Sequence, residues 1–126
     1  MAFGRRVLQI AGIYGLIVLL PQFFLENRIG HDEPPAITHP EFFYGFLGVG
    51  AAWQVAFLIM AQDPRRYRLM IIPSIIEKFS FGIAVVALFT MGRASGTVLG
   101  FAMIDLVLGL LFIEAYRRTK PSGESD

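Results

Sequence analysis

The chain has 126 residues, of which 55% are hydrophobic and 17% are charged, and its formal net charge is +1. The apolar share exceeds that of an ordinary soluble domain, and the near-neutral balance gives no basis for a nucleic-acid partner. The sequence has no cysteine, which excludes disulfides, thiolate chemistry and cysteine-ligated metals. A chain of this length has room for a single domain, here residues 1–126.

Four apolar stretches fill most of the chain, at about residues 7–24, 42–61, 69–91 and 97–116. A bilayer hydrocarbon core of about 30 Å requires about 20 predominantly apolar residues in a helix, and each stretch comes close to that length. We therefore predict an all-α integral membrane protein, a four-helix bundle with an up-down-up-down course.

Basic residues gather on one side of the predicted membrane. They precede the first stretch, separate the second from the third and follow the fourth, at Arg5, Arg6, Arg65, Arg66, Arg68, Arg117, Arg118 and Lys120. The positive-inside rule then predicts that both termini are cytoplasmic, and we expect a bacterial inner membrane. The final segment, 117–126, reads as a cytoplasmic tail that is disordered from Thr119 onward.

The first stretch follows two arginines, so a cleavable signal peptide is the competing interpretation of residues 1–24. No small-residue cleavage site follows it, which favours a retained helix. Small residues form a stripe in each of the first two stretches, at Ala11, Gly12 and Gly15 and then at Gly45, Gly48 and Ala52. We expect both stripes to pack within the bundle, with a homodimer face as the alternative.

The first connection, residues 25–41, is the only long one, and we predict a solvated outer loop. It holds both histidines, His31 and His39, which are weak candidates for a divalent metal because their spacing matches no ligand motif. Because neither histidine lies in an apolar stretch, a haem held by two histidines inside the bundle is excluded. No other cofactor signature is present, so no cofactor is expected.

The second connection is a tight turn beginning with Asp63-Pro64. Its arginines, Arg65, Arg66 and Arg68, are candidates for contacts with lipid phosphates. A second short turn near Gly92 joins the third and fourth stretches, so sequential helices should be antiparallel neighbours.

Ionisable residues lie well inside the third and fourth stretches: Glu77, Lys78 and Asp105. Aspartate or lysine at the centre of a membrane helix costs about 2.5 to 3.5 kcal/mol, so these groups should face inward and pair. Counted from the cytoplasmic ends, Lys78, Asp105 and Gln54 lie within one helical turn of each other in depth. We predict a Lys78–Asp105 ion pair, with Gln54 bonded to Glu77 or completing the shell of the pair.

Two interpretations of this cluster remain open. It is either a structural latch that fixes the helix register or a functional pocket. The aromatic residues expected to line such a pocket are Tyr14, Trp53, Phe81 and Phe101. Pro73 either kinks the third helix one turn before Glu77 or lies in its first turn.

The four-span layout, the segment Asp63-Pro64-Arg65-Arg66-Tyr67-Arg68 leading to Glu77-Lys78, and Asp105 in the last helix resemble small bacterial membrane proteins of the DoxX-like kind. The layout is also similar to the EXPERA group, which includes sterol isomerases and lipid-binding proteins. That resemblance implies that Glu77, Asp105 and Trp53 surround an apolar ligand. It assigns no catalytic roles residue by residue.

Three functions are therefore compatible with the sequence. The favoured one is a non-catalytic accessory or scaffold subunit, whose partners are membrane lipids and other membrane subunits or copies of itself. The alternative is a bundle that encloses an apolar or lipid-like ligand, with proton transfer of an isomerase type as its chemistry. The third is a small oligomeric transporter. No complete catalytic motif is present, so a non-enzymatic role is favoured.

Overall fold

The computed structural model describes residues 2–121, and within that range the chain forms five α-helices and no strand. Four of the helices are long, namely α1 (Ala2–Leu19), α3 (Pro40–Gln62), α4 (Ile71–Thr90) and α5 (Gly96–Arg118). With the 3-10 turns that extend α1 and α4, each long segment has 23 residues and is apolar enough to cross a membrane. The prediction of four long apolar helices is confirmed.

The breaks between helices come from local chemistry. Pro21 lies in the 3-10 helix Leu20–Phe24, which ends the regular part of the first apolar stretch. Gly92 follows α4 with φ of 73°, a left-handed conformation that glycine adopts without strain. Ser95 then caps α5, because its hydroxyl oxygen accepts a hydrogen bond from the backbone N–H of Val98 at 3.2 Å.

Pro73 lies in the first turn of α4, which begins at Ile71. The N–H groups of a first turn have no partner within an α-helix, so proline costs little there. Of the two interpretations offered by the sequence, the structure therefore supports a proline in the first turn, and α4 continues past it as one helix.

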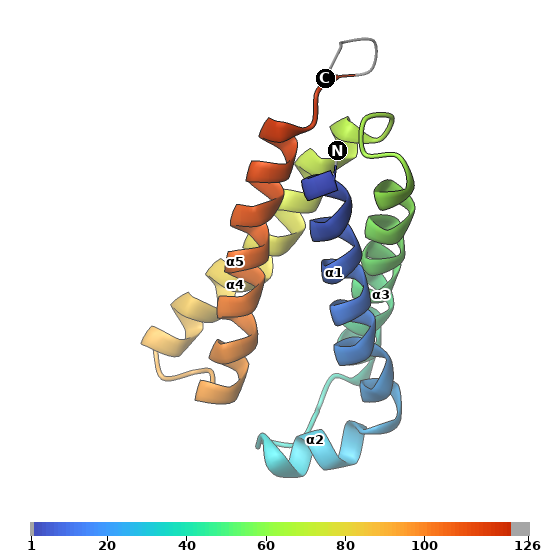
Figure 1. Ribbon diagram of the computed structural model, residues 1–126. Helices are drawn as coiled ribbons and strands as arrows, with labels where there is room; N and C mark the ends of the chain where they lie inside the picture. Colours follow the sequence, from blue (N-terminus) through green and yellow to red (C-terminus); the bar gives the residue numbers. More distant parts are fainter. Residues whose placement is uncertain (1, 122–126) are drawn as a thin grey trace.

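The long helices associate as two pairs. Helix α1 packs along α3, α4 packs along α5, and contacts between α1 and α5 join the pairs. In Figure 1 the pairs lie close together at the end that holds residues 2 and 121, and they spread apart toward the opposite end.

The tightly packed end contains the hydrophobic core. Phe57 of α3 and Phe112 of α5 are both fully buried and meet edge to face, with their ring centroids 5.0 Å apart. Around them lie apolar residues from all four long helices: Val7, Leu8, Ala11, Met60, Ala61, Ile71 and Leu108. This core fixes the pairs to each other at one end only, which leaves room between them at the other.

Small residues make the close helix contacts possible. A Cβ atom at Gly15 would overlap the side-chain amide of Gln54, and one at Gly109 would lie 2.8 Å from the ring of Phe79. Backbones can therefore approach closely along α1–α3 and α4–α5.

The stripe at Gly45, Gly48 and Ala52 does not pack within the described chain, so that expectation was wrong. These residues are exposed on α3, and a Cβ at either glycine would meet nothing within 4 Å. Sequence spacing puts the three residues on one face but does not say whether that face turns inward, because lipid is as apolar as the interior.

The first connection also differs from the predicted loop. It contains a short helix, α2 (Glu26–Asp32), which lies across the open end of the molecule in Figure 1. Two side-chain hydrogen bonds anchor this region. The Tyr44 hydroxyl donates to Glu26 at 2.9 Å, and the Ser95 hydroxyl donates to Glu33 at 2.9 Å.

The segment predicted to be a disordered tail begins as ordered structure. Thr119 is fully buried, and its carbonyl oxygen accepts a hydrogen bond from Arg68 Nε at 2.5 Å. The prediction of disorder was therefore wrong for Thr119, because Arg68 supplies a partner for its carbonyl at the end of α5. Residues 122–126 lie outside the described residues.

Candidate functional site

A cleft of about 630 Å³ separates the two helix pairs. It extends from mid-height in the bundle to α2 at the open end, and every long helix contributes to its walls. The polar cluster predicted from the sequence lies at its inner end, and the lining includes Tyr14, Val18, Gln22, Leu25, Ile29, Phe46, Gln54, Glu77, Lys78, Phe81, Thr97, Phe101 and Asp105.

Lys78 is the centre of the polar cluster and is only 2% exposed. Its Nζ lies 3.6 Å from Asp105 Oδ1 and 3.8 Å from Glu77 Oε2. The first of these is the ion pair that the sequence predicts. The ammonium also lies 5.1 Å from the centre of the Phe57 ring, on the core side. Lys78 thus links the hydrophobic core to the cleft.

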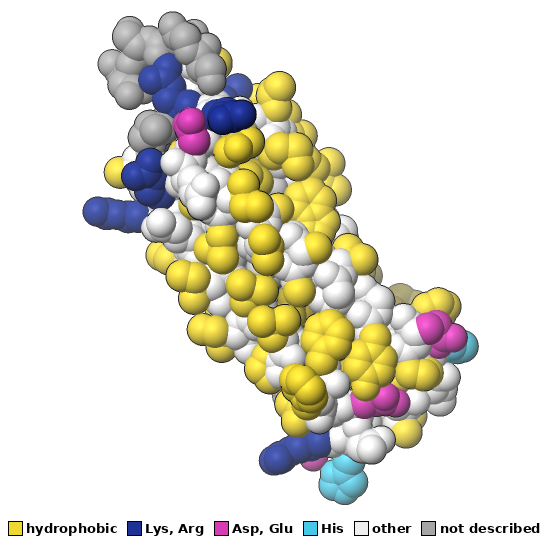
Figure 2. All heavy atoms as spheres, turned by 90° about the vertical axis from the view of Figure 1, so that its right-hand side faces the viewer, with side chains coloured by type: hydrophobic (Ala, Val, Ile, Leu, Met, Phe, Trp, Pro, Cys, Tyr) yellow, Lys and Arg dark blue, Asp and Glu magenta, His cyan; other side chains and the backbone are white. Residues whose placement is uncertain are grey.

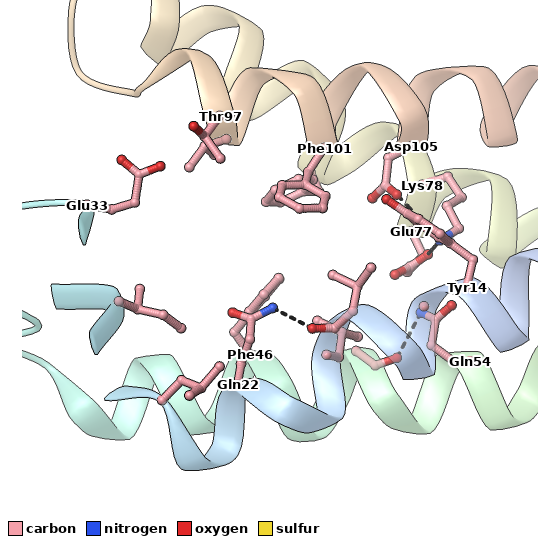
Figure 3. A pocket seen from close by; sticks show the side chains of 18 of the residues that line it. Tyr14, Gln22, Glu33, Phe46, Gln54, Glu77, Lys78, Thr97, Phe101 and Asp105 are labelled. Atoms are coloured by element: carbon pink, nitrogen blue, oxygen red, sulfur yellow. Dashed lines mark hydrogen bonds and ion pairs between the residues drawn. The ribbon is translucent and has the colours of Figure 1, made fainter. Parts of the chain in front are cut away.

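Figure 3 shows how the helices present this cluster. Glu77 and Lys78 come from α4 and Asp105 from α5, and they face Tyr14 of α1 and Gln54 of α3 across the cleft. Adjacent positions on a helix point about 100° apart, so Glu77 and Lys78 cannot both be directed at the core. The buried one is Lys78, whereas the side chain of Glu77 remains 21% exposed.

Gln54 lies in the cleft wall but does not make the predicted bond to Glu77. Its Nε2 donates to the backbone carbonyl of Gly50 at 2.9 Å, a contact within its own helix. Its Oε1 has no hydrogen-bond partner within residues 2–121, although Gln54 is only 2% exposed. The bond to Glu77 is not made because the backbone one turn earlier offers the amide a nearer acceptor. The alternative, that Gln54 completes the shell of the ion pair, stays a prediction.

The aromatic candidates are placed differently from one another. Tyr14, Phe81 and Phe101 line the cleft. Trp53 does not: it packs near Phe57, with ring centroids 6.2 Å apart, and lines a second, more open groove between α3 and α4. Trp53 therefore shares a groove with Glu77, as expected, but it does not line the cleft that holds Lys78 and Asp105.

The cleft and the second groove have walls in common. Phe46, Gly50, Glu77 and Phe81 line both of them. The rings of Phe46 and Phe81 stack with centroids 5.8 Å apart, between α3 and α4. Glu77 can consequently be approached from the cleft and from the side of the molecule.

The outer end of the cleft was not predicted from the sequence. Asp32 and Glu33, at the end of α2, line it together with Thr97. In Figure 3 Glu33 and Thr97 lie far from the Lys78 cluster along the length of the cleft. A signal was present in the sequence, because Leu25 and Ile29, four residues apart, are spaced for one face of a helix, and both line the cleft.

The weak metal candidates do not converge. His31 Nδ1 lies 3.2 Å from Asp32, while His39 lies 3.7 Å from Glu41 and stacks on Phe42. Among residues 2–121, no group of three potential metal ligands is found.

The arginines of the second turn bind the protein itself. Arg65 donates to the carbonyl of Pro121 at 3.1 Å, and Arg68 stacks over the ring of Tyr116 at 3.8 Å in addition to bonding Thr119. Arg66 is exposed beside Tyr67. Their contact with lipid phosphates stays a prediction.

Comparison of the chain with family models, with curated proteins and with solved structures gives no match. The resemblance to DoxX-like proteins stays a prediction.

Proposed function

We propose that this protein is an up-down-up-down four-helix bundle in a membrane and that it binds an apolar, lipid-like molecule in the cleft between its helix pairs. The observation that carries this proposal is the cleft itself. It has mostly apolar walls and a compact polar cluster at its inner end. Ligand pockets have this combination, with volumes of about 300 to 1,000 Å³.

The surface supports a membrane location. Large apolar side chains are exposed on every long helix, for example Ile17 at 67%, Val49 at 63%, Ile76 at 63% and Leu110 at 59%. In Figure 2 apolar side chains cover the middle of the face in view, and charged side chains gather at its two ends. A soluble monomer rarely exposes so much contiguous apolar surface. The arginine-rich end then faces the cytoplasm of a bacterial inner membrane.

The cleft has an apolar part and a polar inner end, which favours a ligand with an apolar body and a polar group. Phe46, Phe81 and Phe101 offer aromatic surface to an apolar body, and Glu77 and Asp105 offer acceptors to a polar group. The side groove gives such a molecule a route from the bilayer to Glu77 without crossing water. A structural latch would need the ion pairs but would not need the space beside them.

A native mass spectrum of the protein purified from its own membranes is the first test. We expect one lipophilic small molecule per chain, released on activation of the ion. A co-purifying polypeptide in place of a small molecule would instead support the accessory-subunit role.

A matched pair of variants assigns binding to the cleft. Val18 lies in the cleft wall, and its neighbour Ile17 is 67% exposed on the outer face. In lipid nanodiscs, we expect the wild-type protein and Ile17→Trp to bind the neutral probe N-phenyl-1-naphthylamine above the level of empty discs. Val18→Trp fills the cleft and should lose that binding. Equal signals from all three proteins and from empty discs would refute the proposal.

A second candidate, an accessory subunit or homo-oligomer, is favoured by the exposed stripe on α3. Gly45, Gly48 and Ala52 would allow another membrane helix to approach closely. Gly48→Leu should then dissociate a complex that the wild-type protein forms in mild detergent. A complex of unchanged mass in that variant would rule out this use of the stripe.

A further inference from the structure

We propose that the ligand of the cleft is an amphiphilic cation, which places a positive charge beside Glu77 and Asp105 and an apolar body along the aromatic wall. This inference rests on the proposed function and adds the chemical class of the molecule bound. It arises from the charges and hydrogen-bond acceptors that the protein leaves unmatched.

The first argument is the count of charges. Two carboxylates, Glu77 and Asp105, share one ammonium, that of Lys78. Lys78 is the only cation among the described residues that line the cleft. When both carboxylates are ionised, one negative charge in the middle of the bundle is therefore uncompensated. Such a charge is costly in a medium of low dielectric constant, and a bound cation removes that cost.

The second argument is the shortage of donors. Gln54 Oε1 and Glu77 Oε2 are buried, and neither has a hydrogen-bond partner among the described residues. The Gln54 amide nitrogen is already bonded to Gly50. Lys78 is held by its two carboxylates and covered by Phe57. The amide of Gln54 and the ammonium of Lys78 are thus engaged, and the site presents mainly acceptors and negative charge, with the Tyr14 hydroxyl as a remaining donor in the cleft wall.

The third argument concerns the rest of the cleft. Its outer end carries two further carboxylates, Asp32 and Glu33. Asp32 lies 3.6 Å from Arg28, and Glu33 accepts the hydrogen bond of Ser95. Acidic groups at both ends of a low-dielectric cleft raise the local concentration of cations. Aromatic faces between them, at Phe81 and Phe101, stabilise a cation further.

Two probes of the same shape and opposite charge test the inference. Tetraphenylphosphonium and tetraphenylborate are both apolar ions, and neither donates a hydrogen bond, so they differ mainly in charge. Binding to the protein in phosphatidylcholine nanodiscs is measured by equilibrium dialysis. Each ion also partitions into the lipid of the discs, so the amount bound by discs that contain Val18→Trp, whose cleft is filled, is subtracted. We expect the phosphonium to bind the cleft at least about tenfold more tightly than the borate.

Variants locate the effect. Glu77→Gln and Asp105→Asn each remove the uncompensated charge, so each should lower the ratio of phosphonium to borate affinity by about tenfold. Glu114→Gln, on the same helix as Asp105 but outside the cleft lining, should leave the ratio unchanged. Circular dichroism and gel filtration establish that each variant is folded, and the wild-type ratio decides the question if both cleft variants fail to fold.

Each outcome has a separate meaning. Equal affinities, or tighter binding of the borate, would overturn the inference, as would an unchanged ratio in folded Glu77→Gln and Asp105→Asn. If the wild-type protein binds the neutral naphthylamine probe but does not discriminate between the two ions, only the cation inference fails. If neither the neutral probe nor the ions bind the cleft, the proposed function fails with it.

Discussion

Replacing Lys78 by methionine should strongly destabilise the protein. The ammonium lies 3.6 Å from Asp105 and 3.8 Å from Glu77, and each attraction is worth about 4 kcal/mol at an effective dielectric constant of 20. Much of that attraction is offset by the cost of removing three charges from water. Breaking a buried pair, which leaves the carboxylates facing each other, costs about 3 to 5 kcal/mol in free energy of unfolding.

Unfolding in mixed micelles with increasing dodecyl sulfate measures this free energy. The single tryptophan, Trp53, packs near the core and reports the transition by fluorescence. Arg93→Met, an exposed cation in the turn between α4 and α5, is the control and should change stability by less than about 0.5 kcal/mol.

A triple variant separates charge from packing. Adding Glu77→Gln and Asp105→Asn to Lys78→Met removes every charge of the cluster, so most of the lost stability should return. Two results would refute the reasoning: wild-type stability in Lys78→Met, or a triple variant as unstable as Lys78→Met. The second result would mean that packing of the lysine stem, and not its charge, holds α4 to its neighbours.

Three further predictions concern packing, the open end and topology. Gly15→Leu should lower the free energy of unfolding by about 1 to 3 kcal/mol in the same assay, because the leucine side chain would overlap the opposite helix. Gly48→Leu should be nearly neutral in the monomer, and equal effects of the two variants would contradict an inward face at Gly15 and an outward face at Gly48. Ser95→Ala removes a helix cap and an anchor of the α2 region, so it should cost about 1 kcal/mol and speed hydrogen exchange in α2; unchanged exchange there would argue against the anchor. Because the chain has no cysteine, single cysteines at Arg66 and His31 can be labelled with a membrane-impermeant maleimide, and the proposed topology requires labelling from opposite sides.

The sequence is informative wherever a property is local. Apolar stretches of sufficient length, separated by Asp63-Pro64 and by Gly92, predict the last three long helices to within a few residues. The first helix both begins and ends about five residues earlier than the predicted stretch, and the 3-10 helix Leu20–Phe24 completes it. The depth of a side chain in the membrane is a local property as well, because it follows from counting residues along its helix. Lys78 and Asp105 were therefore predicted to meet, and they do.

The partners and faces of the helices could not be predicted in the same way. In a soluble protein, an apolar stripe marks the inward face, but in a membrane protein both faces are apolar and the hydropathy pattern no longer distinguishes them. Gly15 faces Gln54 inside, whereas Gly48 faces outward, although both belong to similar stripes. For the same reason the sequence did not show that Trp53 lies on the side of Glu77 away from the cleft, in the groove between α3 and α4.

The sequence by itself determined the four long apolar helices, the two short turns that follow the second and third of them, and the common depth of the ionisable residues, because each of these follows from composition and distance along the chain. Only the tertiary structure decided that α1 pairs with α3 and α4 with α5, that the pairs separate into a cleft, and that α2 lies across its open end. Those features depend on which small residues allow two backbones to approach, a fit between surfaces far apart in the sequence that no single segment encodes.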